Sequence, residues 1–353
     1  MILPTGYPAA LLILGFALFL WGSWANTQKL AGKWRFELFY YDYSLGVLIC
    51  TVAAAFTLGS MNSRELTFQD NFLITGYRNM AFAVAAGMVF NLANLLLVAA
   101  IAVSGLAIAF PLVVGLALVF GVVWNFVANP QENLMLLFGG SLLVLTAVVI
   151  NAIAFSSYRQ ALAEAAKTAF LVDPRAKSAP KTIGAARAVV LSVISGLVMS
   201  LVIPLAQSSR SGENGVGPYG FALMVGAGIF ASTLFYVPFF ANFPVTGRPV
   251  EVARYFTGTR RDHLLGILGG ALWAGGTIAA LVAVAAPLTF NLNGAVGAAL
   301  PPAAALVSAL WGLLAWHEFK DAGFRTRMLL VTMFVLFIAG VSMVSLGPIY
   351  ASK

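Results

Sequence analysis

The amino-acid sequence predicts an all-α integral membrane protein in which ten transmembrane helices form two inverted five-helix repeats. Two stretches, 79–131 and 264–316, each run 53 residues without an Asp, Glu, Lys, Arg or His. A membrane-spanning helix needs about 20 apolar residues, so each stretch can hold two spans and a tight turn. Hydrophobic residues make up 61% of the chain and charged residues 9%, whereas water-soluble domains contain about 25% charged residues. The composition therefore excludes a soluble fold.

Apolar runs between charged or turn-rich breaks predict the ten spans. They cover residues 7–26, 43–60, 80–102, 104–127, 134–156, 187–207, 219–242, 264–286, 293–316 and 328–348. The third and fourth spans meet near Val103-Ser104-Gly105, and residues 286–294 separate the eighth from the ninth. The segment 1–6 carries no basic residue, so the first apolar run is predicted to be a span rather than a cleaved signal peptide.

Basic residues are distributed unevenly between alternate loops. Sixteen of the 20 lie in odd-numbered loops, whereas the other side, termini included, holds Arg64, Arg78, Arg210 and Lys353. The positive-inside rule then places both termini outside and the long middle loop in the cytoplasm. The net charge of +8 follows from this loop bias, so the expected partner is the lipid bilayer, here a bacterial inner (plasma) membrane, and not nucleic acid.

The chain divides at its middle loop. Residues 1–156 form the predicted first five-helix repeat, 157–186 the cytoplasmic loop, and 187–353 the second repeat. The loop begins with a helix-compatible segment, 157–171, and continues as a basic, proline-containing tail, 172–181. It is either a docking or regulatory segment or, more simply, a linker whose basic face lies on anionic lipid.

Residues of the two halves match in the same order at offsets of about 183 to 193 positions. The pairs are Ala86-Gly87 with Gly269-Gly270, Phe90 with Trp273, Asn94 with Thr277, Pro111 with Pro302, Gly121 with Gly312, and Met135-Leu136-Leu137 with Met328-Leu329-Leu330. Each half has an odd number of spans, so equivalent helices cross the bilayer in opposite directions. Such repeats are typical of secondary transporters with a site near the midplane; the alternative is a duplicated scaffold without a transport role.

Short motifs carry a resemblance to a known superfamily. Span one ends in WGSWANTQK (21–29), the next loop runs FELFYYDYS (36–44), span four contains Ala109-Phe110-Pro111, and span nine ends with Trp311-Gly312 and Trp316-His317-Glu318. With these motifs the chain resembles the drug/metabolite transporter superfamily, in particular the bacterial glucose/ribose porter and rhamnose–proton symporter branches and the plant ureide permeases. The resemblance covers essentially all ten spans and implies a transporter, but these apolar motifs are weak indicators of substrate.

The strongly ionisable residues all fall in loops or at predicted helix ends. An anion transporter would be expected to bury a Lys or Arg with its substrate, and a cation exporter would be expected to carry a carboxylate deep in the membrane. Neither is visible, so the sequence favours a small, neutral, polar substrate such as a sugar or a ureide.

Polar and aromatic residues near the predicted midplane are the candidates for binding it. They are Asn91 and Asn94 in span three, Trp21 and Trp24 in span one, Tyr236 in span seven, and Trp273 and Thr277 in span eight. Amides supply donors and an acceptor for hydroxyl or ureide groups, and aromatic rings stack on a sugar or a planar ureide. The alternatives are interhelical hydrogen bonding for the asparagines and for Ser232 and Thr233, and a place in the interfacial aromatic belt for Trp24.

Proline breaks and carboxylates suggest how the transporter would move and be driven. Pro111 and the pair Pro301-Pro302 interrupt corresponding spans and are candidate hinges; the alternative is a tolerated proline near a helix start. Asp42 and Glu318 are the candidates for proton coupling, and each has a simple alternative as a solvated interfacial charge. Sodium held by neutral oxygens and facilitated diffusion are also possible.

The function that these observations predict is secondary transport of a neutral polar metabolite, as H⁺- or Na⁺-coupled uptake by alternating access. A multidrug or amino-acid exporter on the same scaffold is the alternative. Cys50 has no partner for a disulfide or a metal, and His263 and His317 stand at predicted loop edges. No nucleophile–base pair, metal-ligand spacing or phosphate-binding motif occurs. An enzyme, a cofactor and a metal site are therefore not expected, and the oligomeric state is not indicated.

Overall fold

The computed structural model describes residues 3–4, 6–61, 67–128, 133–172, 183–245, 247–285, 292–347 and 350, and within these ranges every regular element is a helix. In chain order they are α1 (Tyr7–Ser23), α2 (Asn26–Leu30), α3 (Phe36–Phe56), α4 (Phe68–Ile74), α5 (Tyr77–Ser104), α6 (Leu106–Ala128), α7 (Leu134–Val172), α8 (Ile183–Ser200), α9 (Val202–Arg210), α10 (Pro218–Asn242), η1 (Val252–Thr257), α11 (Arg260–Val284), α12 (Leu292–Leu310), η2 (Trp311–Ala315) and α13 (Phe324–Leu346). Their apolar composition fits an integral membrane protein.

Nine helical segments in the described part of the chain are long and apolar enough to cross a bilayer. They correspond to nine of the predicted spans. The segment predicted as the ninth span forms α12 and continues into the short π-helix η2, and its apolar part, Pro301–Ala315, is shorter than the others. The predicted break before it falls mostly outside the described residues, so a count of ten spans stays a prediction.

Two helix boundaries differ from the prediction by seven residues or more, because charged residues proved compatible with a long helix. α3 begins at Phe36 instead of at 43, since Glu37 and Asp42 are both buried there. α7 continues to Val172, through the first half of the predicted middle loop; residues 173–182 of that loop lie outside the described part. The predicted break near Ser104 is confirmed: α5 ends at Ser104 and α6 begins at Leu106, separated by Gly105 with φ +87°.

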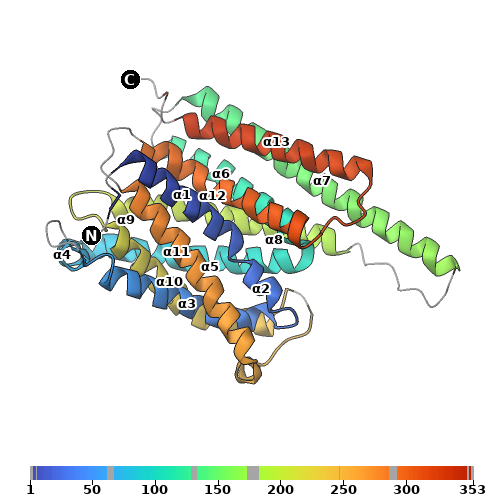
Figure 1. The fold of residues 1–353 in the computed structure, drawn as a ribbon, viewed down its shortest axis with the longest axis horizontal. Coiled ribbons are helices and arrows are strands. Elements are labelled where there is room, and N and C mark those ends of the chain that lie inside the picture. Colours follow the sequence, from blue (N-terminus) through green and yellow to red (C-terminus); the bar gives the residue numbers. More distant parts are fainter. Residues whose placement is uncertain are drawn as a thin grey trace.

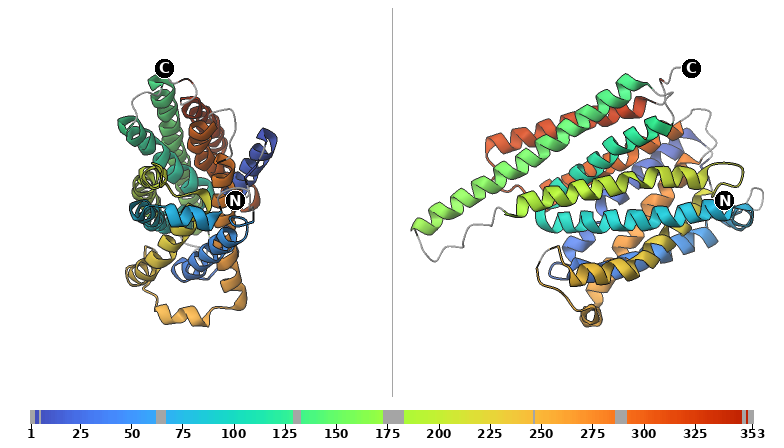
Figure 2. Two further views of the ribbon diagram at one scale, coloured as in Figure 1. Left: turned by 90° about the vertical axis from the view of Figure 1, so that its left-hand side faces the viewer. Right: turned by 180° about the vertical axis from the view of Figure 1, so that it is seen from behind.

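The long helices form a bundle in which α1 begins and α13 ends at the same end (Figure 1). At one edge α7 and α13 lie side by side, and the C-terminal half of α7 projects beyond the bundle (Figures 1 and 2). Near the other edge, α3 packs against both α10 and α11. The segment around α2, the connection between α5 and α6, and the segments of η1 and η2 gather at the end of the bundle opposite the start of α1 (Figure 1). We call this the loop end.

Glycines allow two pairs of helices to cross at backbone contact. A Cβ on Gly87 of α5 would collide with the carbonyl oxygen of Val225 on α10, and a Cβ on Gly270 of α11 would collide with the carbonyl oxygen of Tyr43 on α3. Only glycine tolerates so close an approach, which is how small residues bring membrane helices together.

Each of these crossings is also reciprocal. Gly228 of α10 faces the carbonyl of Val84, and Gly46 of α3 faces the carbonyl of Ile267. In both crossings, the contacted carbonyl belongs to the residue three positions before the partner glycine. The α5–α10 and α3–α11 contacts therefore have the same register.

Candidate functional site

An amide and two phenols are buried together where α5 meets α3. The Asn94 Nδ2 atom donates to the hydroxyl oxygens of Tyr40 at 2.9 Å and of Tyr43 at 3.2 Å. Asn94 is 1% exposed, and the two tyrosines are fully buried. Both phenols accept from one amide, so their own O–H hydrogens are available to another acceptor. We call Asn94, Tyr40 and Tyr43 the amide–phenol cluster.

Aromatic rings cover this cluster. The Trp24 ring lies 4.9 Å from that of Tyr43 and 6.2 Å, edge-on, from that of Phe110, while Tyr40 and Tyr43 are 4.8 Å apart. Trp24 is 2% exposed, which does not fit a lipid-facing belt residue. Helices α1, α3, α5 and α6 thus contribute to one buried core of polar and aromatic groups.

Asn91 shares α5 with Asn94 but faces a different helix. Its Nδ2 atom lies 3.0 Å from the carbonyl oxygen of Ile229, 2.7 Å from Ser232 Oγ and 3.0 Å from Thr233 Oγ1, all on α10. Its Oδ1 atom is buried and has no hydrogen-bond partner in the described part of the chain. The amide nitrogen of Asn91 therefore links two helices, whereas Asn94 bonds to groups on α3.

Residues of α11 reach the same core from the second half of the chain. Trp21 Nε1 donates to Thr277 Oγ1 at 3.0 Å, which joins α1 to α11. The rings of Trp273 and Phe90 lie 4.5 Å apart and join α11 to α5. Tyr236 of α10 packs against this core as well. The structure thus gathers the seven predicted substrate-binding residues around one hydrophobic core.

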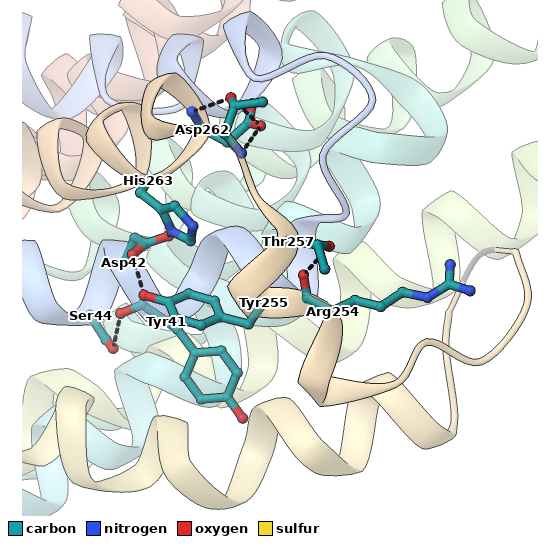
Figure 3. A network of polar contacts seen from close by, with 9 residues as sticks. Tyr41, Asp42, Ser44, Arg254, Tyr255, Thr257, Asp262 and His263 are labelled. Atoms are coloured by element: carbon teal, nitrogen blue, oxygen red, sulfur yellow. Dashed lines mark hydrogen bonds and ion pairs between the residues drawn. The ribbon is translucent and has the colours of Figure 1, made fainter.

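A second polar group, drawn in Figure 3, lies at the loop end. Asp42, 2% exposed, accepts from the hydroxyl of Tyr255 at 2.6 Å through Oδ1 and contacts His263 Nδ1 at 2.8 Å through Oδ2. An ionised carboxylate only accepts, so Nδ1 of the imidazole carries the hydrogen. Asp42 comes from α3, Tyr255 from η1 and His263 from the first turn of α11. We call these three residues the Asp42 triad.

Tyr255 is suited to remain a donor in this triad. Burial raises the pKa of its phenol, and the hydrogen bond to the Asp42 carboxylate raises it further. The phenol therefore stays protonated throughout the physiological pH range. Asp42 is the buried member of the triad, whereas Tyr255 and His263 are partly exposed. Gly266 of α11 lies directly beside the Asp42 side chain, where a Cβ would collide with it.

One turn of α3 connects the two polar groups. Tyr40 and Tyr43 point to Asn94, whereas Asp42, between them in sequence, points to His263 and Tyr255. Successive positions of a helix face different directions, so a single turn serves both sides. A displacement of this turn would change both groups together.

Glu318 lies in a different environment at the same end of the bundle. Its two carboxylate oxygens accept from the backbone N–H groups of Leu106 and Ala107, each at 2.8 Å, at the start of α6. It is also paired with Lys29, whose ammonium lies 4.9 Å from the centre of the Trp316 ring. A carboxylate at a helix N-terminus satisfies free N–H groups and favours the helix dipole.

Two indoles close the loop end around Glu318. Trp316 Nε1 donates to Asn26 Oδ1 at 2.6 Å, and Trp311 Nε1 donates to Ser23 Oγ at 2.9 Å. These contacts join the end of α1 to the segment between α12 and α13. We call this set of contacts the closed arrangement of the loop end.

The prolines predicted as hinges lie inside helices. Pro111 interrupts α6, and Pro301 and Pro302 interrupt α12. Because proline has no N–H, the carbonyl four residues before Pro111, that of Ala107, loses its helical partner. Asn151 of α7 approaches that carbonyl with its Nδ2 atom, at 3.5 Å from Ala107 O and 3.3 Å from Ile108 O.

Several of these residues were not predicted as site residues. Tyr40 stood in a segment predicted to be a loop and Tyr43 at the predicted start of span two, because the charges around them moved that predicted start. His263 stood at a predicted loop edge and Tyr255 inside the same predicted loop, and no spacing connects them to Asp42, 221 and 213 positions away. The pattern Tyr-Tyr-Asp-Tyr, polar aromatic residues around one carboxylate, was the available signal. The described residues contain no group of three or more His, Cys, Asp or Glu side chains that could hold a metal ion.

Comparisons with known proteins give one distant relationship. No family model matches the chain, and no solved structure matches it. The chain is 24% identical to Ureide permease 1 of Arabidopsis thaliana over 379 residues, which cover 92% of this chain and 93% of the plant protein. The similarity extends over nearly the whole of both chains and supports a membrane permease rather than an enzyme.

Proposed function

We propose that this protein is a secondary transporter that takes up a small, neutral, polar metabolite such as a sugar or a ureide. The observation that carries the proposal is the buried amide–phenol cluster, which the ring of Trp24 packs against. It offers hydrogen-bond donors and an apolar stacking surface in one place, as a hydroxylated or ureide-containing substrate requires. The similarity to a plant ureide permease over almost the whole chain supports the same substrate class.

The charges of the protein support a neutral substrate. Among the described residues, the buried charged side chains are Glu37 and Asp42, both within the first seven residues of α3 at the loop end. Glu37 is paired with Arg35 at 2.6 Å, and this hydrogen bond raises the pKa of the arginine. The core around Asn94 is lined by neutral groups. A neutral substrate could be buried there without a charged partner.

Alternating access between two inverted repeats is the proposed mechanism. The support for it is that equivalent helices pack against equivalent partners in the two halves. Helix α5 packs on α8 and α10, and its proposed equivalent α11 packs on α1 and α3. Helix α6 packs on α7 and α8, and its proposed equivalent α12 packs on α13 and α1. The equal registers of the Gly87 and Gly270 crossings agree with it. In such transporters, one repeat rocks against the other around a central site.

The Asp42 triad is the proposed coupling site, with a proton as the coupling ion. Both carboxylate oxygens of Asp42 already accept a hydrogen bond, from Tyr255 and from His263, so sodium would have to share these oxygens with two donors. A proton instead has an acceptor in the second ring nitrogen of His263, and the imidazolium would then pair with the Asp42 carboxylate. Through the turn Tyr40–Tyr43, loosening of the triad would reach the amide–phenol cluster.

Glu318 is better explained as a closing contact than as a coupling carboxylate. Its carboxylate oxygens are already engaged by two backbone N–H groups and by Lys29. We propose that release of this contact opens the loop end, with Pro111 and Pro302 as bending points. The positive-inside rule places this end in the cytoplasm of a bacterial cell and both termini outside.

Counterflow uptake into proteoliposomes tests the function, because exchange against a preloaded substrate needs no knowledge of the coupling ion. The panel would contain rhamnose, ribose, glucose, allantoin and a quaternary ammonium dye. The proposal expects saturable exchange of a sugar or a ureide. Exchange of the dye alone would replace it with an exporter on the same scaffold, and exchange of none of the five would count against transport of either class.

Two variants connect that exchange to the proposed site. Asn94→Ala should abolish exchange, while Tyr43→Phe keeps the aromatic ring and should weaken exchange by removing one hydroxyl. Asn242→Ala, which alters an exposed amide at the end of α10, is the matched control and should exchange like the wild type. Full activity of Asn94→Ala would remove the amide–phenol cluster from the binding site.

A further inference from the structure

A surface hollow runs along the first three turns of α11. Arg260, Arg261, Leu264, Leu265 and Leu268 line it. The arginines occupy the first turn of the helix, and the leucines follow at spacings of three and four residues, which places all five on one side of α11. The hollow is therefore basic at its loop end and apolar along the rest of its length.

The two arginines have no counter-charge in the described part of the chain. The ion pairs there involve Lys29, Arg35 and His263. The neighbouring carboxylate, Asp262, is used within the helix cap, where its Oδ2 accepts from the Thr259 backbone N–H at 3.0 Å and from the Thr259 hydroxyl at 2.6 Å. Both guanidinium groups thus face outward with their hydrogen-bond donors free.

The leucines extend this surface into the apolar part of the membrane. Leu264 is 55% and Leu268 48% exposed, as expected for side chains that contact lipid. From Arg260 to Leu268 the helix rises about 12 Å, close to the half-thickness of about 15 Å of a bilayer hydrocarbon core. A molecule bound here would have a charged group at the membrane surface and a chain about as long as a lipid tail below it.

We propose that this hollow binds an anionic phospholipid, with its phosphate held by Arg260 and Arg261 and an acyl chain along Leu264 and Leu268. Guanidinium groups bind phosphate oxygens through paired hydrogen bonds. Two uncompensated positive charges favour a lipid with a net negative charge over a zwitterionic one, in which the phosphate is already balanced. A soluble phosphate would leave the leucines unused.

The position of the lipid gives it a consequence for the protein. Arg260 and Arg261 precede His263, which contacts Asp42, by three and two residues on the same first turn of α11. A lipid bound to both arginines would restrain that turn and so stabilise the link between α11 and α3. This inference does not depend on the substrate or on the coupling ion.

The test measures lipid retention by the purified full-length chain. Protein in mixed micelles containing phosphatidylglycerol and phosphatidylcholine would be examined by native mass spectrometry. The wild type is expected to retain phosphatidylglycerol in preference, and Arg260→Gln/Arg261→Gln to lose about thirtyfold of this affinity. Arg325→Gln/Arg327→Gln, with the same charge change on exposed residues at the start of α13, is the matched control and should bind like the wild type.

Three results would overturn the proposal. The first is retention of phosphatidylglycerol that Arg260→Gln/Arg261→Gln leaves unchanged. The second is an equal loss in both double variants, which would show attraction by net charge without a site. The third is displacement of the lipid by glycerophosphate at the same concentration, which would show that the apolar part contributes nothing. Gel filtration of each variant establishes that it remains folded.

Discussion

Gly22 of α1 and Gly196 of α8 make the same contact in the two halves of the molecule. A Cβ on Gly22 would lie 2.8 Å from the carbonyl oxygen of Ala304 on α12, and a Cβ on Gly196 would lie 2.9 Å from the carbonyl oxygen of Val113 on α6. Neither glycine could therefore carry a side chain without displacing a neighbouring backbone. Each brings its helix into close contact with a helix that is interrupted by proline.

The register of these two contacts agrees with the sequence repeat. Val113 and Ala304 are 191 positions apart, which is the same separation as that of Pro111 and Pro302. The proposed inverted repeat requires such agreement, because equivalent helices must meet equivalent partners at the same depth. In the proposed alternating-access mechanism, these glycines would lie where one repeat moves against the other.

Alanine at either glycine should destabilise the protein. We expect Gly22→Ala and Gly196→Ala each to lower the free energy of unfolding by about 1–3 kcal/mol, because the added methyl group overfills a backbone contact. Thermal unfolding in detergent measures the change. Gly15→Ala is the control: a Cβ there meets no atom within 4 Å, and it should leave stability unchanged or slightly improved. A wild-type melting temperature for both test variants would contradict the contacts.

The two asparagines of α5 should separate stability from transport. Asn91→Ala removes an amide that links α5 to α10, so it should lower the free energy of unfolding by about 0.5–2 kcal/mol and leave the KM for substrate close to that of the wild type. Asn94→Ala should instead abolish exchange or raise KM strongly. Thermal unfolding and concentration-dependent counterflow, measured on both variants, provide the comparison. The reverse pattern would place the substrate beside α10 and not beside α3.

Accumulation of substrate in response to a pH gradient should require the Asp42 carboxylate. In Asp42→Asn the amide cannot pair with an imidazolium at His263, so substrate accumulation should no longer respond to an imposed pH gradient. The measurement is the ratio of uptake with and without the gradient in the same vesicles. His263→Gln should produce the same loss by removing the second member of the pair.

A matched carboxylate controls for charge. Asp321 is exposed at the loop end in the left-handed region, with φ +61°, and asparagine adopts this conformation readily. Asp321→Asn should keep both the response to the gradient and the amount of folded protein. If Asp42→Asn accumulates substrate like the wild type, the proton does not bind at the triad, whatever the substrate.

The sequence predicted the helices well because their signal is local. Long apolar runs, and the turn at Gly105, follow from the chemistry of neighbouring residues in the chain. The start of α3 was wrong because Glu37 and Asp42 were read as loop residues. Their partners are what make burial possible, and those of Asp42 lie more than 200 positions away.

The site was predictable only in part for the same reason. Asn91 and Asn94 were predicted together because they lie three positions apart near the midplane of one span, but this spacing could not show that one contacts α10 and the other α3. Glu318 was recognised as a carboxylate at a span end, yet its role depends on the N-terminus of α6, which only the folded chain brings to it. Spacing within one helix identifies a face but not the group that covers it.

Glu318 and Lys29 should stabilise the closed loop end together. Glu318→Gln should cost about 1–2 kcal/mol, because the carboxylate caps α6 and the change leaves Lys29 unpaired. Lys29→Met should cost less, and the double variant should be more stable than the sum of the single changes predicts. Thermal unfolding of the four proteins gives the coupling energy. Lys320→Met, an exposed lysine of the same loop, is the control and should have no effect.

Pro111 and Asn151 should be coupled through the carbonyl oxygen of Ala107. In the wild type this carbonyl has no helical N–H partner, and Asn151 approaches it from α7, so Asn151→Ala should cost about 1–2 kcal/mol. In Pro111→Ala the new backbone N–H satisfies the same carbonyl, and Asn151→Ala should then cost less than half as much. Thermal unfolding of the single and double variants measures this difference. Equal costs in both backgrounds would show that Asn151 packs against α6 without compensating for the proline, and Pro111 would then bend the helix with no fixed partner for the freed carbonyl.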